Sequence, residues 1–183
     1  MNTGLTAAVL MGGQSRRMGH PKHAVALRNG RTMLDTVAEV AAKVADDVVL
    51  LGPPVDGYRS IADHRPGEGP VAGIESLLRS HCSTRCLILA CDMPRLTPEG
   101  LAPILIPHIT PVVVFSTPGS DTISPLPMVI RRDAAEAVTE YLDAGGRSIR
   151  GLLEQVPHSA IPLDPERADQ IQSVNTPGDL SSL

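Results

Sequence analysis

Short apolar runs alternate along the chain with segments in which hydrophobic residues repeat every three or four positions. The run at residues 6–11, TAAVLM, is too short for a helix and ends at two glycines, so it predicts a buried strand that enters a glycine loop. Apolar residues between Met33 and Val44 repeat at helical spacing and predict a helix with one buried face that ends near Asp46. The run at residues 47–52, DVVLLG, predicts a second buried strand.

The same alternation continues through the middle of the chain. Residues 58–63 predict a weaker third strand, and the loop HRPGEGP then leads into a helix. That helix carries apolar residues on one side, namely Val71, Ile74, Leu77 and Leu78. Residues 86–90 predict another apolar strand, and Thr97 followed by Pro98 is typical of the start of a helix.

The last third of the chain keeps this order. Strands are expected at residues 111–116 and 126–130, and a helix is expected from Asp133 to the glycine pair at 145–146. Near the end, the stretch NTPGD predicts one more helix start, with Thr176 as its cap in an arrangement close to a capping box.

Strands that alternate with helices over most of the chain favour the α/β class, with a largely parallel sheet covered on both faces. No linker or repeat divides the 183 residues, so we expect one domain spanning residues 1–183. With no Trp, two Tyr and one Phe, the core must be aliphatic. The same shortage of aromatic rings, together with a net charge of -4, argues against nucleic acid as a partner.

Cysteine usage and hydropathy bear on the cellular compartment. Cys82, Cys86 and Cys91 are an odd number, and their spacing does not match the close pairs of a zinc site. We therefore expect reduced, mostly buried thiols in a cytoplasmic protein. No stretch of 18 apolar residues occurs, and no basic region precedes an apolar run at the N-terminus, so we expect no association with a membrane.

Positive charge gathers around the first glycines. The first 34 residues contain no acid but five cations, which are Arg16, Arg17, Lys22, Arg28 and Arg31. Glycines after a first strand let the backbone turn several N–H groups inward, which makes a cradle for phosphate oxygens. A small anionic ligand fits this pattern, and an ordinary strand-to-helix turn with solvated basic residues is the alternative interpretation.

Two common glycine fingerprints do not fit this loop. The pair at residues 12–13, followed by Gly19, is not the G-x-G-x-x-G pattern of dinucleotide-binding folds. It is not a Walker A loop either, because two residues separate Gly19 from Lys22. The order G-G-x-S-x-R-M-G-x-x-K after a first strand instead resembles the signature of nucleotidyltransferases that activate sugars and cofactors.

Two carboxylates follow predicted strands. Ligands of an open parallel sheet bind beyond the carboxyl ends of its strands, so Asp92 is placed to hold a metal ion over a bound triphosphate. Asp63 ends another predicted strand, and we expect the two carboxylates to converge opposite the cationic loop. A helix cap or a turn is the alternative role for an acid at either position.

Four motifs, in this order, resemble those of the molybdenum cofactor guanylyltransferases, a group of MobA-like, Rossmann-like nucleotidyltransferases. They are LMGGQSRRMGHPK at residues 10–22, GPVAGI at 69–74, CDMP at 91–94 and VNTPGDL at 174–180. The resemblance runs nearly from end to end and implies a three-layer fold around a mostly parallel sheet.

The resemblance also implies roles for single residues. The residues that line the nucleotide would be Leu10, Met11, Gly12, Gly13, Lys22, Asp63 and Asp92. Catalysis would depend on Arg17 and Lys22 at the phosphates and on Asp92 as the ligand of Mg²⁺, and Asn175 would face the acceptor.

The chain departs from the family pattern at four places. Met11 stands where the family has Ala, and Pro21 stands where it has Asp before the lysine. Leu51 occupies the end of the second strand, from which an Asn often reaches the nucleotide, and Ser173 replaces one of two Asn in the closing motif. Recognition of the base and of the acceptor is therefore less well specified by the sequence than binding of phosphate.

The implied reaction is attack by a terminal phosphate of molybdopterin, or of the molybdenum cofactor, on the α-phosphorus of GTP, with release of pyrophosphate. Protein partners that deliver the cofactor, or molybdoenzymes that receive it, are further expectations. One alternative is a related transfer that uses CTP or another phosphorylated acceptor such as phospholactate. The other is a nucleotide-binding module without turnover, against which the intact Lys22 and Asp92 count.

Overall fold

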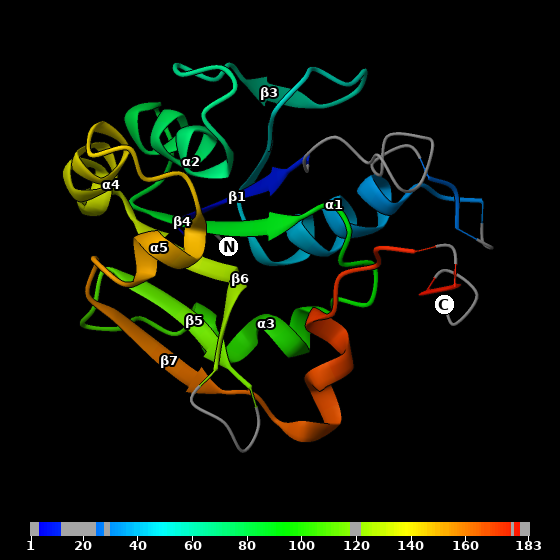
Figure 1. The fold of residues 1–183 in the computed structure, drawn as a ribbon. Coiled ribbons are helices and arrows are strands. Elements are labelled where there is room, and N and C mark those ends of the chain that lie inside the picture. Colours follow the sequence, from blue (N-terminus) through cyan, green and yellow to red (C-terminus); the bar gives the residue numbers. More distant parts are fainter. Residues whose placement is uncertain (1–3, 12–24, 28–29, 118–121, 177, 180–183) are drawn as a thin grey trace.

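A seven-stranded sheet with the order β3-β2-β1-β4-β6-β5-β7 runs through the middle of the molecule (Figure 1). The computed structural model describes residues 4–11, 25–27, 30–117, 122–176 and 178–179. The strands are β1 (Leu5–Leu10), β2 (Asp47–Leu51), β3 (Arg59–Ile61), β4 (Arg85–Ala90), β5 (Val112–Ser116), β6 (Ile123–Arg131) and β7 (His158–Pro162). Each predicted strand has a counterpart in this sheet, as the hydrophobic pattern requires.

Six of these strands run in one direction, and β6 runs against its two neighbours. Strand β1 pairs in parallel with both β2 and β4, with Ala8 opposite Val49 on one side and Ile88 on the other. Strand β6 is antiparallel to β4 and to β5, whereas β5 and β7 are parallel. The expected α/β class with a mostly parallel sheet is therefore confirmed.

Within the described residues, five α-helices pack on the two faces of the sheet. They are α1 (Met33–Val44), α2 (Pro70–Arg79), α3 (Pro98–Leu105), α4 (Ala135–Asp143) and α5 (Ile149–Leu153). The apolar sides of α1 and α3 join the core on one face, and those of α2, α4 and α5 join the core on the other. Among the residues that the structure describes, every helix is too short or too polar to cross a bilayer.

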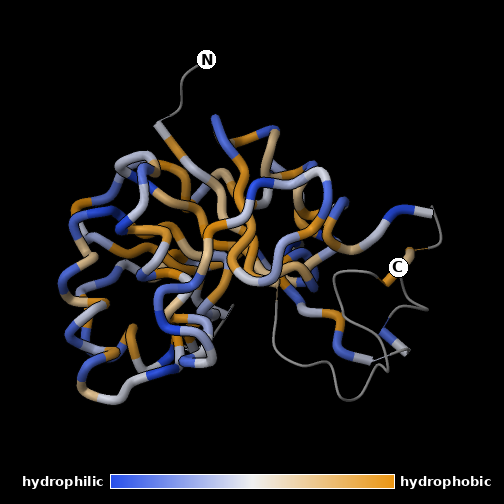
Figure 2. The backbone as a smooth tube through the Cα atoms, turned by 90° about the horizontal axis from the view of Figure 1, so that it is seen from above, coloured by the Kyte–Doolittle hydropathy of each residue, from blue (hydrophilic) through white to orange (hydrophobic). Residues whose placement is uncertain are grey.

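The core is aliphatic, as the composition predicts. All six residues of β1 are buried, and its side chains alternate between the two cores, with Ala7 and Val9 on the side of α1 and Ala8 on the side of α2. A continuous apolar run is the usual pattern of a strand covered on both faces. Figure 2 shows apolar residues concentrated in the centre of the molecule and polar residues mainly around them.

The cysteines behave as expected, since all three are buried thiols. The Cys86 thiol donates to the sulfur of Cys82 over 3.5 Å at the base of β4. Cys91 lies at the other end of this strand and is 1% exposed.

Helix starts follow the predicted capping residues. The Thr97 hydroxyl accepts a hydrogen bond from the Gly100 amide at 3.0 Å, and Pro98 is the first residue of α3. Near the end of the described chain, Thr176 and Asp179 exchange the two hydrogen bonds of a capping box. Pro177, predicted as the first helical residue there, lies outside the described residues.

The hydrophobic pattern did not predict three elements. Strand β7 has no apolar run because it is an edge strand whose residues are only partly buried or exposed. The short helix α5 and a 3₁₀ helix at Pro165–Ile171 also lack a long periodic pattern. Strand β6 begins at Ile123, three residues earlier than expected, because the sheet accommodates two prolines in its first half.

Candidate functional site

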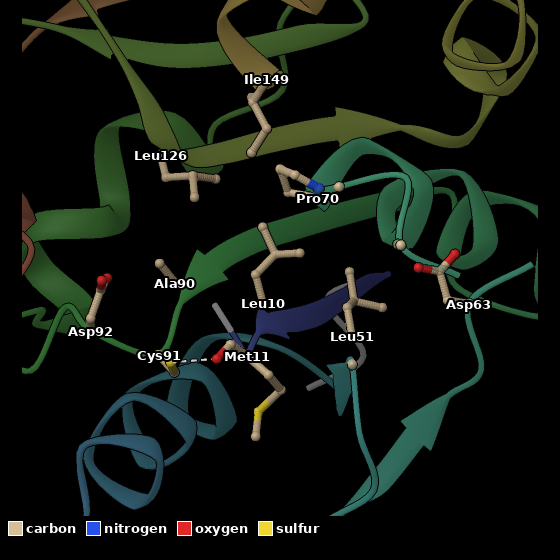
Figure 3. Close-up of a pocket in the computed structure, with 14 residues that line it drawn as sticks. Leu10, Met11, Leu51, Asp63, Pro70, Ala90, Cys91, Asp92, Leu126 and Ile149 are labelled. Atoms are coloured by element: carbon tan, nitrogen blue, oxygen red, sulfur yellow. Dashed lines mark hydrogen bonds between the residues drawn. The ribbon is translucent and has the colours of Figure 1, made fainter. Parts of the chain in front are cut away.

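A cavity of about 430 Å³ opens at the carboxyl ends of β1, β2 and β4 (Figure 3). Its lining consists of Leu10, Met11, Leu51, Gly52, Asp63, Gly67, Gly69, Pro70, Gly73, Ala90, Cys91, Asp92, Leu126 and Ile149. This is the edge of a parallel sheet at which ligands of α/β proteins bind. Most of the walls are apolar, and the two acidic side chains in this lining are Asp63 and Asp92.

The backbone around Met11 is held by the strands on both sides of β1. The Met11 amide donates to the Leu51 carbonyl at 3.1 Å, and the Cys91 amide donates to the Leu10 carbonyl at 3.0 Å. The Cys91 thiol also donates to the Met11 carbonyl at 3.3 Å. These bonds fix the direction in which the chain leaves the cavity toward the predicted glycine loop.

Gly52 is required by the close approach of Met11. A side chain at position 52 would place its Cβ 2.9 Å from Met11 Cβ, and the backbone φ angle of +139° is also one that glycine favours. A residue larger than glycine at position 52 would therefore displace the Met11 side chain from the cavity lining. Leu51 adds an apolar side chain to the same wall of the cavity.

Asp92 lies directly beyond β4, at one end of the cavity. Its carbonyl accepts a hydrogen bond from the Val174 amide at 2.8 Å, so a segment from the end of the described chain secures this loop. Asn175, the predicted acceptor residue, follows Val174 and is exposed. The backbone amide of Asn175 donates to Asp179 Oδ2 at 2.8 Å. Asn175 does not belong to the lining of the cavity.

Asp63 follows β3 and lies at the opposite end of the cavity from Asp92 (Figure 3). Its Oδ1 atom accepts a hydrogen bond from the Arg65 amide at 3.0 Å. The two carboxylates thus line one cavity from opposite ends, and the expectation that they converge was wrong. Within the described ranges, no three His, Cys, Asp or Glu side chains gather as a metal site.

The amino end of α2 closes one side of the cavity. Gly69 precedes the helix with φ +84°, and a Cβ there would lie 3.2 Å from the Arg147 carbonyl oxygen. Pro70 is the first helical residue, as the GPVAGI motif suggests, and Gly73 lies one turn further along the same wall. The partial positive charge at a helix amino end favours an electronegative ligand nearby.

The remaining predicted site residues fall outside the described part of the chain. They are Gly12, Gly13, Arg17 and Lys22. The structure describes the chain as far as Met11, which lines the cavity, and again from Val25. The Val25 carbonyl accepts a hydrogen bond from the Met33 amide at the start of α1.

Sequence reasoning missed the apolar wall opposite β1. Leu126 comes from the antiparallel strand β6 and Ile149 from the first turn of α5. No local motif marks them, because their place at the cavity depends on how distant elements pack. Cys91 belongs to the CDMP motif, but the hydrogen bond from its thiol to the Met11 carbonyl is evident only in the structure.

Comparison with known proteins shows the family to which the chain belongs. The model of the MobA-like NTP transferase domain matches residues 7–160. The chain belongs to the MobA-like NTP transferase family. The match begins within β1 and ends within β7, so it includes every strand and helix that contributes to the cavity.

Relatives of this MobA-like protein align over nearly its whole length. A "Probable molybdenum cofactor guanylyltransferase" of Carboxydothermus hydrogenoformans is 32% identical, over 98% of this chain and 94% of its own. A molybdenum cofactor guanylyltransferase of Xanthomonas euvesicatoria is 29% identical over 97% and 93%. The crystal structure of molybdopterin-guanine dinucleotide biosynthesis protein A from Archaeoglobus fulgidus, 25% identical, superposes with a TM-score of 0.79 over 97% and 95%.

Proposed function

We propose that the protein transfers GMP from GTP to the terminal phosphate of molybdopterin, or of the molybdenum cofactor, and releases pyrophosphate. The observation that carries this proposal is the cavity beyond β1 and β4, with Asp92 at one end and the start of the predicted phosphate loop, Met11, in its floor. Full-length relatives that bear the name molybdenum cofactor guanylyltransferase supply the choice of nucleotide and acceptor.

The two ends of the cavity suit different parts of a nucleotide. We expect the triphosphate at the end of Asp92 and the guanine base between the apolar walls, toward Asp63. Guanine presents two neighbouring N–H donors on one edge, and a carboxylate accepts hydrogen bonds without donating any. Leu51 and Ile149 offer apolar contact to the faces of the base.

The donor set at Asp92 fits a magnesium ion. Magnesium prefers oxygen ligands and is often bound by one or two carboxylates together with substrate phosphates, so a single protein carboxylate beside a triphosphate suffices. When bound, the ion would neutralise charge on the phosphates. Arg17 and Lys22 are proposed to share this task from the loop after Met11.

No covalent enzyme intermediate is needed for this chemistry. A phosphate of the acceptor is anionic at neutral pH, so it attacks the α-phosphorus of GTP without a general base. A phosphorus–oxygen bond to the acceptor forms as the bond to the leaving pyrophosphate breaks. The contribution of the chain is to align the two phosphates and to stabilise charge on the transferred group and on pyrophosphate.

The test compares the wild type with Asp92→Asn, using mass spectrometry of the products formed from molybdopterin and GTP, CTP or ATP with Mg²⁺. We expect Asp92→Asn to lose transfer by about a hundredfold or more, because a bound cation contributes several kcal/mol to such a reaction. The exposed Asp56, outside the cavity lining, provides the control variant Asp56→Asn, which should retain wild-type turnover.

The same assay measures the choice of nucleotide. One unmade buried hydrogen bond costs about 1 to 3 kcal/mol, so we expect a preference for GTP of roughly tenfold to a hundredfold. The apolar Leu51 favours the lower end of this range. A preference for CTP would refute guanylyl transfer while leaving the phosphate end intact, and near wild-type turnover of Asp92→Asn would refute the metal assignment.

A further inference from the structure

Residues 63–69, in the loop between β3 and α2, form one wall of the cavity and are called here the wall loop. It contributes Asp63, Gly67 and Gly69 to the lining. A loop that carries a ligand-binding carboxylate must be held in place, since a small displacement of such a group lowers affinity sharply. The contacts of the wall loop therefore bear on how well the cavity recognises its ligand.

A buried carboxylate on α2 holds the wall loop. The side chain of Glu75 is 2% exposed. Arg65 Nε donates to Glu75 Oε2 at 2.9 Å, and Arg65 Nη2 donates to Glu75 Oε1 at 3.1 Å, so the guanidinium presents two parallel bonds to one carboxylate. The Thr139 hydroxyl adds a hydrogen bond of 2.8 Å to Oε1, and Arg79 Nε lies 3.6 Å from the same atom.

Stability alone does not account for an ion pair at this position. Apolar residues of similar volume often replace a buried ion pair with no loss of stability, because the desolvation of two charges offsets much of their attraction. What such a pair does provide is a defined geometry, since the planar guanidinium fork fits a carboxylate in one orientation. The Glu75–Arg65 pair thus fixes the position of the residue that bears the guanidinium.

Arg65 connects this buried anchor to the ligand-facing carboxylate. Its backbone amide donates to Asp63 Oδ1 at 3.0 Å. Its Nη1 atom donates to Asp143 Oδ1 on α4 at 2.6 Å, a contact in which the Asp143 side chain is 60% exposed. Arg65 therefore binds Glu75 through its guanidinium and orients Asp63 through its backbone amide.

Two further contacts tie the wall loop to its surroundings. The His64 amide donates to the hydroxyl of the buried Ser76 at 2.9 Å. Glu68 forms an ion pair of 3.2 Å with Arg147, in the segment between α4 and α5. Glu75 and Ser76 are neighbours on α2, so this helix holds two successive residues of the loop, Arg65 and His64.

We propose that Glu75 and Arg65 are positioning residues that set the affinity of the cavity for the base of its nucleotide by holding Asp63 in place. This inference rests on the proposed function, in which Asp63 faces the base and Asp92 faces the phosphates. The pair lies next to Asp63, because the Arg65 amide donates to Asp63 Oδ1 and its guanidinium binds Glu75. Its loss should weaken contacts with the base and leave contacts with the phosphates unchanged.

Glu75→Gln is the main variant, because it keeps the size of the side chain and removes the charge that binds Arg65. We expect the Kd for GTP, measured by calorimetry with Mg²⁺, to rise roughly tenfold, as is typical when a supporting hydrogen bond is lost behind a ligand contact. The Kd for pyrophosphate should stay within about twofold of the wild type, and kcat at saturating GTP should change little.

Two variants complete the set. Arg65→Lys keeps a positive charge but cannot form two parallel bonds, so it should reproduce the selective loss of GTP affinity. Asp143→Asn removes the exposed partner of the same guanidinium and is the matched control, with GTP binding expected at the wild-type level. Thermal unfolding establishes that each variant is folded. If Glu75→Gln does not fold, the GTP affinity of Arg65→Lys tests the positioning role instead.

The outcomes separate this inference from the function on which it rests. Unchanged GTP affinity in folded Glu75→Gln, or equal losses for GTP and pyrophosphate, would overturn the positioning role. If Asp63→Asn binds GTP as tightly as the wild type, the assignment of Asp63 to the base fails instead. A GTP-selective loss in Asp63→Asn, Glu75→Gln and Arg65→Lys, with Asp143→Asn unaffected, supports both.

Discussion

A hydrogen bond between Tyr58 and Asp35 connects the segment before β3 to the first turn of α1. The Tyr58 hydroxyl, just before β3, donates to Asp35 Oδ1 in the first turn of α1 at 2.7 Å. Burial and the Asp35 carboxylate raise the pKa of Tyr58 to about 12. Hydrogen bonds from Thr32 and Tyr58 lower the pKa of Asp35 below its usual 3.8.

The pKa shifts of Tyr58 and Asp35 predict that the free energy of unfolding falls at alkaline and at acidic pH. The pKa of Tyr58 is raised on folding, so its contribution is complete below pH 10 and is lost as the pH rises toward about 12. The pKa of Asp35 is lowered on folding, so its contribution is present above pH 3.8 and is lost as the pH falls through the folded value. Between these limits both groups stabilise the fold.

Tyr58→Phe tests the alkaline limit. The variant loses one hydrogen bond to a carboxylate, and we expect its free energy of unfolding at pH 7 to fall by about 1 to 3 kcal/mol. Urea unfolding at several pH values from 7 to 11 is the measurement. The difference between wild type and variant should shrink as the pH rises above 10, and a constant difference across this range would contradict the assignment.

Among the elements, α1 begins with a complete capping box. The Thr32 hydroxyl accepts a hydrogen bond from the Asp35 amide at 3.0 Å, and Asp35 Oδ2 accepts one from the Thr32 amide at 3.2 Å. This cap orients the helix that follows the predicted phosphate loop. Because Tyr58 contacts the same aspartate, the cap also connects α1 to the segment before β3.

Thr32→Ala should lower the free energy of unfolding by about 0.5 to 2 kcal/mol, since the Asp35 amide loses its acceptor at the helix start. Thr32→Ser should restore most of this loss because it keeps the hydroxyl. Thr36→Ala is the control, as the Thr36 hydroxyl only adds a second bond to a carbonyl that the helix already uses. Equal losses in Thr32→Ala and Thr36→Ala would show that the cap is not the stabilising contact.

How well an element could be predicted depends on where its stabilising contacts lie. Strand β1 and helix α1 were predicted because their apolar residues are buried in a regular pattern, which the sequence displays directly. Strand β7 was missed because it is held by backbone bonds to β5 at the edge of the sheet, which demand no apolar run. Helix α5 is only five residues long, and a helix of that length depends on tertiary packing.

At the scale of the whole molecule, stability should be greatest in the middle of the sheet. Strands β1 and β4 each pair on both sides, and β1 is buried along its full length. Strand β3 has three residues and, in the part of the chain that the structure describes, pairs only with β2. We expect native-state hydrogen exchange to give the slowest amides in β1 and β4, with opening free energies near that of global unfolding.

The amides of β3 should exchange orders of magnitude faster, through local opening at the edge of the sheet. Mass spectrometry or NMR of exchanging amides at neutral pH measures the difference. Protection of β3 equal to that of β1 would mean that the wall loop and the edge strand open only with the whole fold.

The candidate site was predictable where it follows a rule of sheet topology. Asp63 and Asp92 line the cavity because acids that follow parallel strands lie at the same edge of the sheet. The opposite placement of these two residues was not predictable, because β1 and β2 separate β3 from β4 in the sheet order. Leu126 and Ile149 reach the cavity only through the reversed direction of β6 and the packing of α5.

The hydrogen bond from the Val174 amide to the Asp92 carbonyl has a consequence during synthesis on the ribosome. Strands β1, β2 and β4 leave the ribosome early and can pair with one another, but the loop at Asp92 lacks its fastening until Val174 has emerged. At about 5 to 20 residues per second, this interval lasts several seconds. We therefore expect the position of Asp92 in the cavity to be fixed only late in synthesis, after the strands beside it have been made.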